Sequence, residues 1–361
     1  MKLTPMSEWI PGLEHPLVIA GPCSAENEDQ MLSTAKEIAK DSRIRVFRAG
    51  IWKPRTRPNC FEGIGEPGLA WLKKVKEETG LLISTEVANA DHVKLALEYG
   101  VDILWIGART SANPFSVQAI ADALVGVDIP VMVKNPVNAD LALWVGAIER
   151  IHGAGITKIA AIHRGFSTGD KSKFRNLPKW TYPIQLKEQL PDVPLICDPS
   201  HIAGKRDLVP EVCQKAMDVG MDGLMVETHN NPEVALSDKA QQVTPQNLKV
   251  ILDKISLRQE YSDDSECESE LADLRSQIDR IDEEILEALK LRMNVVNKIG
   301  TTKKSYNITP LQIHRMDSLM KERTERAKSF GLKEEYIHDL FHVIHTESVK
   351  NQTEIMNEFK S

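Results

Sequence analysis

The sequence has 361 residues, of which 42% are hydrophobic and 27% are charged, as expected for a globular protein of about two domains. Its formal net charge of -7 argues against nucleic acid or an anionic membrane surface as a partner. The five cysteines have no paired spacing, the N-terminus has no apolar signal region, and no apolar run approaches the roughly 18 residues of a membrane span, so we expect a cytoplasmic protein.

The first part of the chain alternates short apolar runs with amphipathic stretches, several of which end in glycine, a common helix stop. Eight such units within roughly 240 residues are typical of a (β/α)8 barrel, and a doubly wound open sheet is the alternative. We assign the barrel to residues 1–256. The predicted strands are LVIA at 17–20, RVFRA at 45–49, LLIST at 81–85, ILWIG at 103–107, VMVK at 131–134, KIAAIH at 158–163, PLICD at 194–198 and GLMVE at 223–227.

The remaining chain has no strand signal. Residues 257–268 are polar and acidic, which predicts a linker, and residues 269–361 are expected to form an all-α domain of three helices. Thr309 is a candidate N-cap for the second helix, with Pro310 in its first turn. Because three helices in so short a domain form a thin core, we expect it to pair with a second copy, giving a homodimer or a higher homo-oligomer.

Four residues with metal-ligating side chains follow the first, seventh and eighth predicted strands. The loops after the strands of a barrel open on one face, where such enzymes have their active sites. Each side chain alone could be structural: a buried cysteine, a capping histidine or a solvated aspartate. Together a thiolate, an imidazole and two carboxylates suit one divalent ion such as Mn, Fe, Co or Zn. The four candidate ligands are Cys23, His201, Glu227 and Asp238.

Cationic side chains gather at the same strand ends, which favours a phosphorylated or carboxylated substrate. Surface ion pairs are the alternative, but Arg48 and Lys134 end apolar strands, where an unpaired charge is costly. A Schiff-base aldolase using Lys134 is a second alternative, and it would need no metal. The cations are Arg48, Lys53, Arg55, Arg109, Lys134 and Arg164.

The motifs GPCS, KPRT, GART, HRG, DPSH and VETH, in this order over about residues 15–256, resemble 3-deoxy-D-arabino-heptulosonate 7-phosphate synthases of the type I beta group. The resemblance implies a metal-dependent condensation of phosphoenolpyruvate with D-erythrose 4-phosphate that releases phosphate. The related synthase that uses arabinose 5-phosphate shares the fold but is not expected to have KPRT. The resemblance implies that Arg48, Lys53, Arg109, Lys134 and Arg164 bind phosphoenolpyruvate, with Lys53 and Lys134 as catalytic candidates, that Arg55 and Thr56 bind erythrose 4-phosphate, and that Cys23, His201, Glu227 and Asp238 bind the metal.

Two cations interrupt an apolar stripe of the predicted helical domain. Arg292 and Lys303 are eleven residues apart, about three helical turns, so they face the same way. Ser348 and Gln352 share a stripe on the third helix. Cations on such a stripe are costly unless an acid or a ligand pairs them, although snorkelling of partly exposed side chains is the alternative.

The segments LRSQIDRIDEEILEALKLR, GTTKK, LQIHR and SVKNQ, over about residues 266–361, resemble the all-helical chorismate mutases, which rearrange chorismate to prephenate without a metal. Lys303 and Gln352 are implied at the breaking ether bond, and Arg275 in the site of the partner subunit. Gln312 stands where some members have Asp, and Met316 where Glu is common. The alternative is a dimerisation and feedback-sensing module, with prephenate as a possible inhibitor. The implied site residues are Arg275, Arg292, Lys303, Gln312, Arg315, Ser348 and Gln352.

Overall fold

The structure is a computed structural model that describes residues 1–53, 61–169, 172–258 and 263–357. The chain divides into two compact units, Met1–Glu260 and Tyr261–Ser361. Arg55 and Thr56 of the predicted site lie outside the described residues. Within the described ranges, no helix combines the length and the apolar character needed to cross a membrane.

The first unit is a closed barrel of eight parallel strands, ordered as in the sequence. The alternative of an open sheet is wrong, because β1 pairs with both β2 and β8. All eight strand predictions are confirmed to within about two residues, the usual uncertainty of element ends. The strands are β1 (Leu17–Gly21), β2 (Ile44–Arg48), β3 (Leu82–Val87), β4 (Ile103–Ile106), β5 (Val131–Lys134), β6 (Ile159–His163), β7 (Leu195–Cys197) and β8 (Gly223–Glu227).

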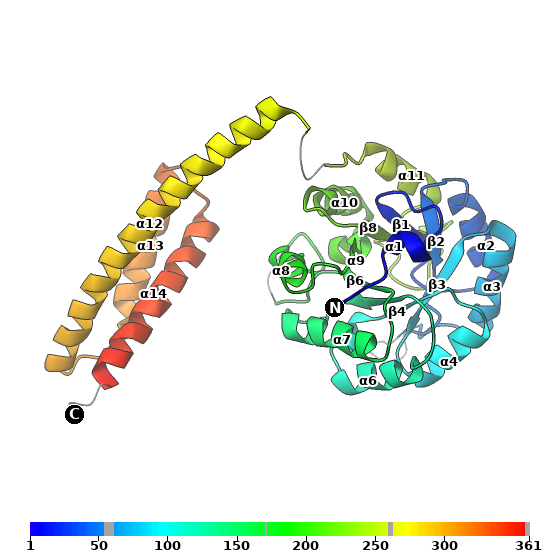
Figure 1. Cartoon of the computed structure of the whole chain (residues 1–361), viewed down its shortest axis with the longest axis horizontal. Helices are drawn as coiled ribbons and strands as arrows, with labels where there is room; N and C mark the ends of the chain where they lie inside the picture. Colours follow the sequence, from blue (N-terminus) through cyan, green and yellow to red (C-terminus); the bar gives the residue numbers. More distant parts are fainter. Residues whose placement is uncertain (54–60, 170–171, 259–262, 358–361) are drawn as a thin grey trace. The chain divides into compact units, whose positions relative to one another are not determined.

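Helices cover the outside of the barrel (Figure 1). Several begin at a side chain that caps the first backbone amides, as Asn27, Asn89, Asn113 and Asp140 do. The helices are α1 (Met6–Trp9), α2 (Glu28–Ile38), α3 (Pro67–Thr79), α4 (Ala90–Glu98), α5 (Ala108–Ser111), α6 (Pro114–Ala123), α7 (Leu141–Gly153), α8 (Thr181–Gln189), α9 (Pro199–Ala203), α10 (Val209–Asp218) and α11 (Pro245–Lys254), with 3-10 turns η1 (Arg206–Leu208) and η2 (Pro232–Val234).

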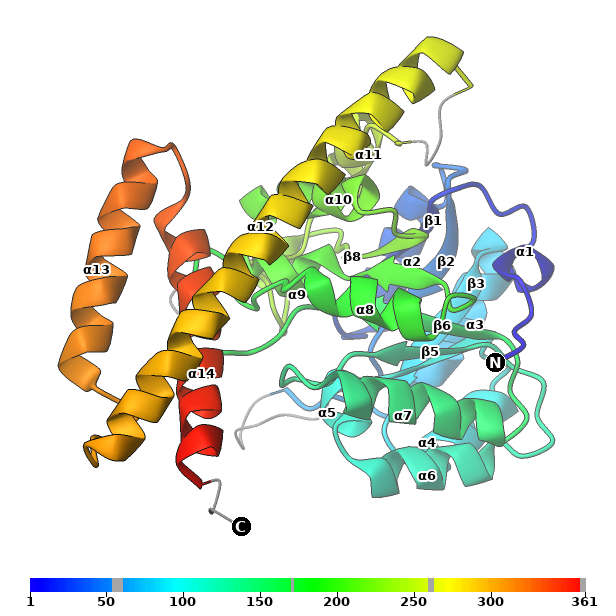
Figure 2. The same ribbon diagram turned by 60° about the vertical axis from the view of Figure 1, so that its left-hand side comes forward.

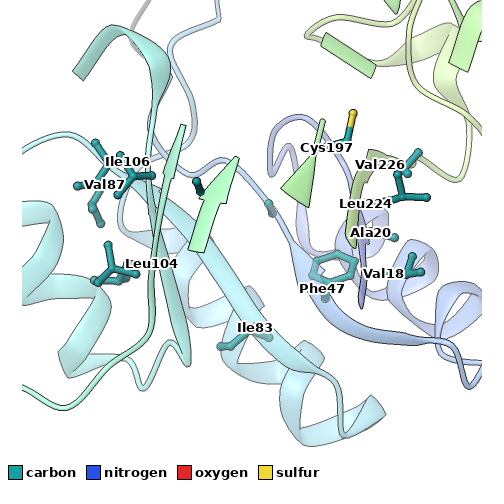
Figure 3. Close-up of a cluster of buried hydrophobic side chains, with 14 of the residues drawn as sticks. Val18, Ala20, Phe47, Ile83, Val87, Leu104, Ile106, Cys197, Leu224 and Val226 are labelled. Atoms are coloured by element: carbon teal, nitrogen blue, oxygen red, sulfur yellow. The ribbon is translucent and has the colours of Figure 1, made fainter. Parts of the chain in front are cut away.

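Alternate strand residues face two separate cores. Val18 and Ala20 belong to the larger core between the strands and the helices, part of which is drawn in Figure 3. Leu17 and Ile19 belong to the core inside the barrel, which Trp9 of α1 also joins. Because successive side chains of a strand point to opposite faces, the uninterrupted apolar runs in the sequence fill both cores and leave the strand ends for polar side chains.

The second unit consists of three helices, α12 (Ser265–Ser305), α13 (Ile313–Ser329) and α14 (Glu334–Asn357). Asp264 caps α12, and α14 packs against both α12 and α13 (Figure 2). The prediction of Thr309 as the N-cap of the second helix is wrong, because α13 begins at Ile313 with Gln312 at the N-cap. The backbone before α13 is held differently: the Pro310 carbonyl accepts a hydrogen bond from the Lys303 ammonium at 2.6 Å.

The long helix α12 has an apolar face that this unit does not bury. Ile278, Ile281 and Ile285 have 56%, 55% and 51% of their surface exposed, although they recur at the spacing of a helix face. Leu271 and Leu274 extend the same face toward the N-terminus of the helix and are exposed as well. A contiguous exposed apolar stripe of this kind marks an interaction surface.

Candidate active sites

Two cations form the floor of the barrel mouth. Arg48 and Lys134 are the last residues of β2 and β5, and both are buried. The Arg48 guanidinium carbon lies 4.9 Å, and the Lys134 ammonium 5.9 Å, from the ring centre of Trp105 in the inner core. Cation–π attraction to this ring offsets part of the cost of burying the two charges.

A thiol and two carboxylates converge beside these cations. The ligand atoms of Cys23, Glu227 and Asp238 all lie within 4.8 Å of one another, a spacing that fits one metal ion. Cys23 follows β1, Glu227 ends β8, and Asp238 lies beyond η2 with a positive φ of 47°. The Cys23 thiol donates to Asp238 Oδ2 at 3.3 Å.

The fourth predicted ligand, His201, lies at the edge of this group. Its Nε2 is 3.7 Å from Glu227 Oε1, and its Nδ1 is 2.8 Å from Asp198 Oδ2. Asp198 also caps α9, accepting from the His201 amide at 3.1 Å, so the helix start fixes the histidine. Burial lowers the pKa of His201, which favours the neutral imidazole that a metal requires.

The residues present fit a divalent cation. Burial, with the charge of Glu227 added, raises the pKa of the Cys23 thiol to about 12. For Glu227 burial alone would raise the pKa, but His201 and Arg48 outweigh it and lower the pKa. Its Oε1 is buried without a hydrogen-bond partner in the part of the chain that the structure describes. This oxygen lies 3.4 Å from Arg48 Nη2 and 3.7 Å from His201 Nε2. A carboxylate oxygen with no hydrogen bond, beside a thiol and an imidazole, is an environment that a metal ion satisfies.

Four of the predicted anion-binding cations, Lys53, Arg109, Lys134 and Arg164, line a cavity of about 70 Å³. Lys53 donates to the Cys23 carbonyl at 3.0 Å and lies 3.2 Å from its sulfur. Arg164 is held by Asn176 Oδ1 at 2.8 Å. An anion in so small a cavity would touch several cations at once. The residues that line it are Lys53, Glu86, Gly107, Ala108, Arg109, Lys134, Arg164, Arg175, His201 and Asp238.

Lys134 forms a buried ion pair with Asp198, with the ammonium 2.7 Å from Oδ2. A Schiff-base aldolase needs a free amine, whereas this amine is engaged by the Asp198 carboxylate. The geometry therefore disfavours the Schiff-base alternative and favours a lysine that binds an anion or donates a hydrogen bond.

The helical unit brings together residues of α12 and α14. Arg292 donates to Ser348 Oγ at 2.5 Å. Burial and the neighbouring Arg323 lower the pKa of Arg292, and burial lowers that of Lys303. Gln352 is buried, and its Oε1 has no hydrogen-bond partner among the described residues. These groups provide donors for an anionic ligand between the two helices.

Three other predicted residues of the helical site are exposed in this chain: Arg275, Gln312 and Arg315. Arg275 precedes Arg292 by seventeen residues, or roughly 25 Å along a helix. One chain therefore does not bring Arg275 to the Arg292 site. Met316 is partly buried on α13 and offers no oxygen ligand.

The barrel mouth also contains residues that were not predicted as site residues, among them Asp198, Arg175 and Gln241. Asp198 could have been found, since an Asp-Pro pair three residues before His201 has the form of a helix start. Arg175 and Gln241 lie in irregular segments, where no periodicity indicates the direction of a side chain.

The fold and the barrel mouth define a (β/α)8 enzyme with an anion-binding cavity beside a candidate metal centre. The chain belongs to the DAHP synthetase I family, whose family model matches residues 1–262. The model of chorismate mutase type II matches residues 274–353, so the helical unit contains a chorismate mutase domain.

Parts of the chain are similar to known proteins. Phospho-2-dehydro-3-deoxyheptonate aldolase of Thermotoga maritima is 36% identical over 62% of this chain, which spans only 64% of that protein's length. A solved structure of this Thermotoga protein has a TM-score of 0.59 and 31% identity, covering 66% of this chain and 67% of the other. A 2-dehydro-3-deoxyphosphooctonate aldolase of Acidithiobacillus ferrooxidans is 30% identical over 63% of this chain and 84% of its own length.

Proposed function

We propose that the chain is a bifunctional enzyme of the shikimate pathway: its barrel condenses phosphoenolpyruvate with D-erythrose 4-phosphate, and its helical domain rearranges chorismate to prephenate. The observation that carries the first activity is Arg48. It is 1% exposed, and its Nε and Nη1 have no hydrogen-bond partner in the described part of the chain. Its Nη2 donates to the Cys23 carbonyl at 3.3 Å and lies 3.4 Å from Glu227 Oε1. The two remaining donors of this buried guanidinium favour an anionic ligand.

The other cations complete the binding of phosphoenolpyruvate. Arg109 and Arg164 line the cavity with Lys53 and Lys134. Arginine forks suit the phosphate and the carboxylate, and lysines act as point charges. In this proposal Arg55 and Thr56, from the KPRT motif, bind erythrose 4-phosphate. That motif favours erythrose 4-phosphate over the five-carbon sugar phosphate of the related synthase.

Lys53 is the candidate proton donor in the condensation. Burial alone would lower its pKa, but Cys23, Glu86 and Glu227 outweigh that effect and raise it, so the ammonium is retained. It lies 3.2 Å from the Cys23 sulfur and lines the cavity together with the candidate ligands His201 and Asp238. Lys134, paired with Asp198, is the second candidate for polarising a substrate oxygen.

Cys23, His201, Glu227 and Asp238 would hold the divalent metal, whose identity we leave open among Mn, Fe, Co and Zn. When bound, the metal supplies Lewis acidity toward the aldehyde carbonyl. The chain's residues supply the remaining requirements, which are to place the enol carbon against that carbonyl and to exclude water from the cavity.

For the helical domain, Arg292 and Ser348 would bind a carboxylate, with Arg315 and Gln312 as further contacts. Lys303 and Gln352 would stabilise the charge that develops on the breaking ether oxygen. Arg275 would enter the site of a partner subunit, since it lies far from Arg292 along α12. The proposed mutase activity of the helical domain requires a homodimer but no metal.

A dual assay on the purified chain tests both activities. Phosphate release from the two substrates and loss of chorismate are each measured with and without a chelator. The chelator should abolish the first and leave the second intact. Condensation that survives complete metal removal would refute the ligand assignment, and failure to consume chorismate would favour the alternative of a helical domain that only dimerises and senses.

Feedback belongs to the same proposal. Prephenate, the product of the helical domain, is a candidate inhibitor of the barrel, and both reactions take place among the water-soluble metabolites of the cytoplasm. Coupling of this kind requires prephenate to bind two global states unequally. Condensation rates at saturating prephenate decide the matter, since an unchanged rate excludes this regulator.

A further inference from the structure

Two side chains outside the candidate ligand set connect its two carboxylates. Arg175 Nη1 donates to Asp238 Oδ1 at 2.9 Å and to Gln241 Oε1 at 2.8 Å. The amide of Gln241 then donates from Nε2 to Glu227 Oε2 at 2.7 Å. The polarity is consistent along the whole bridge, from guanidinium to amide oxygen and from amide nitrogen to carboxylate.

The bridge occupies one oxygen of each carboxylate and leaves the other for the metal. Asp238 Oδ2 faces the Cys23 thiol at 3.3 Å. Glu227 Oε1 is buried without a hydrogen-bond partner among the described residues, and its charged neighbours are Arg48 Nη2 at 3.4 Å and His201 Nε2 at 3.7 Å. A hydrogen bond to one oxygen fixes the orientation of the carboxylate and uses one lone pair of that oxygen, so the bridge favours binding through the other oxygen in a defined direction.

Arg175 is itself fixed to the helix that carries His201. Its amide donates to the Ala203 carbonyl at 3.4 Å, and the Asn176 side chain donates to the His201 carbonyl at 2.6 Å. Gly204, with a φ of +68°, allows this packing, because a Cβ there would lie 2.3 Å from the Arg175 Cβ. The positions of the His201 imidazole and of Arg175 relative to each other are therefore fixed.

We propose that Arg175 and Gln241 are positioning residues, which together hold Glu227 and Asp238 as one-oxygen ligands of the divalent metal. The proposal deepens the function assigned to the barrel and rests on it. Neither residue needs to touch the metal or the substrates for this role. Outer partners of metal ligands typically change metal affinity or activity by about 10- to 100-fold when they are removed.

A rival role for Arg175 predicts the opposite change in metal affinity when the residue is replaced. If Arg175 only neutralises Asp238 until a metal displaces it, its loss removes a positive charge near a dication and should tighten metal binding. If it orients the carboxylates, its loss should weaken metal binding. A binding measurement therefore separates the two roles without reference to catalysis.

The test uses Co²⁺ and the full chain, stripped of metal, with three single variants. Arg175→Met should weaken Co²⁺ binding about 10- to 100-fold and change the intensity of the visible Co²⁺ absorption, which follows coordination number. Gln241→Leu should weaken binding by a smaller factor. Arg43→Met is the matched control, since Arg43 also pairs with two carboxylates, Asp41 and Asp253, outside the candidate site, and it should leave affinity and spectrum unchanged.

Two further variants sharpen the outcome. The double variant Arg175→Met/Gln241→Leu should bind Co²⁺ no more weakly than Arg175→Met, because the bridge is already broken in the single variant. If the two losses of affinity multiply in the double variant, the two residues act independently and the proposal of a joint role is refuted. Arg175→Lys keeps the positive charge and serves as a second variant in case Arg175→Met does not fold. It too should weaken Co²⁺ binding. Unchanged or tighter binding in both Arg175 variants would refute the positioning role. If the unaltered chain binds no Co²⁺, the proposed metal site is refuted, and with it the proposed function of the barrel.

Discussion

Cys23 is a buried thiol whose protonation should control how the metal affinity depends on pH. It is buried, its pKa is raised to about 12 by burial and by Glu227, and it faces Asp238 at 3.3 Å. A metal can bind its sulfur only as the thiolate, so binding must release one proton. His201 releases none near neutral pH, because burial lowers the pKa of its imidazole.

The apparent association constant of the metal should therefore rise about tenfold per pH unit between pH 6 and 8. Competition titration against a chelator with a known pH dependence measures this slope. Cys23→Ser removes the thiol and should flatten the slope as well as weaken binding. A flat profile in the unaltered chain would mean that Cys23 does not bind the metal.

In the helical domain, Lys303 is the candidate catalytic residue that a single substitution can test. Replacing it with Ala should lower the chorismate mutase kcat about 10²-fold or more, because an oriented donor to the developing charge is lost. Lys298 is exposed on the same helix, so Lys298→Ala serves as the matched control and should keep its rate. Steady-state kinetics on both variants, with condensation by the barrel as an internal reference, make the comparison. An unaffected Lys303→Ala enzyme would place the chorismate site elsewhere.

Elements were more predictable than the contacts of individual residues. The apolar runs predicted all eight strands, because a strand buried on both faces needs no polar position until it ends. Arg48 and Lys134 were visible as interruptions of those runs. The bridge through Arg175 and Gln241 was not visible, since its parts are brought together by tertiary packing alone. Thr309 is not the helix cap, and the backbone beside it is bound instead by the Lys303 ammonium through the Pro310 carbonyl, a contact that local sequence rules do not include.

Gly300 determines how closely α12 approaches α14. A Cβ at this position would lie 3.0 Å from Ile355 Cδ1 and 3.4 Å from Gln352 Cα. Gly300→Val should push α14 outward, displace Gln352 and lower the mutase kcat about 10-fold or more, since small misplacements of site groups are costly. Gly300→Ala is the milder control, because the tip of Ile355 can rotate and alanine gains about 1 kcal/mol of helix propensity. Equal rates in both variants would show that this approach does not set the position of Gln352.

At the scale of the whole molecule, the apolar face of α12 predicts assembly. A paired state would cover Ile278, Ile281 and Ile285 and bring Arg275 to the site of the other subunit. The double variant Ile281→Glu/Ile285→Lys should shift the chain from dimer to monomer in sedimentation and lose mutase activity together. A monomer that rearranges chorismate at the full rate would refute the shared site.

Complementation provides a stricter test of the same arrangement. Arg275→Ala and Lys303→Ala homodimers should each be nearly inactive. A mixed dimer would contain one site with both residues intact and one with neither, so a random 1:1 mixture should regain about a quarter of the mutase activity. Mixing after subunit exchange, followed by rate measurement, detects this recovery. No recovery from dimers that demonstrably exchange would place both residues in a single subunit.

The closure of the barrel has a consequence for the order of events in the cell. β1 and β8 form the seam, paired from Leu17 with Gly223 to Gly21 with Glu227. Cys23 lies on one side of this seam and Asp238, 215 residues later in the chain, on the other. A ribosome therefore delivers one of the four candidate ligands, Cys23, long before the other three, and a metal bound by all four could load only after the last strand has closed. An ion bound there would link the first strand to the last and stabilise the folded barrel by mass action. Metal supply would thus set the lifetime of the barrel in the cell as well as its rate of catalysis.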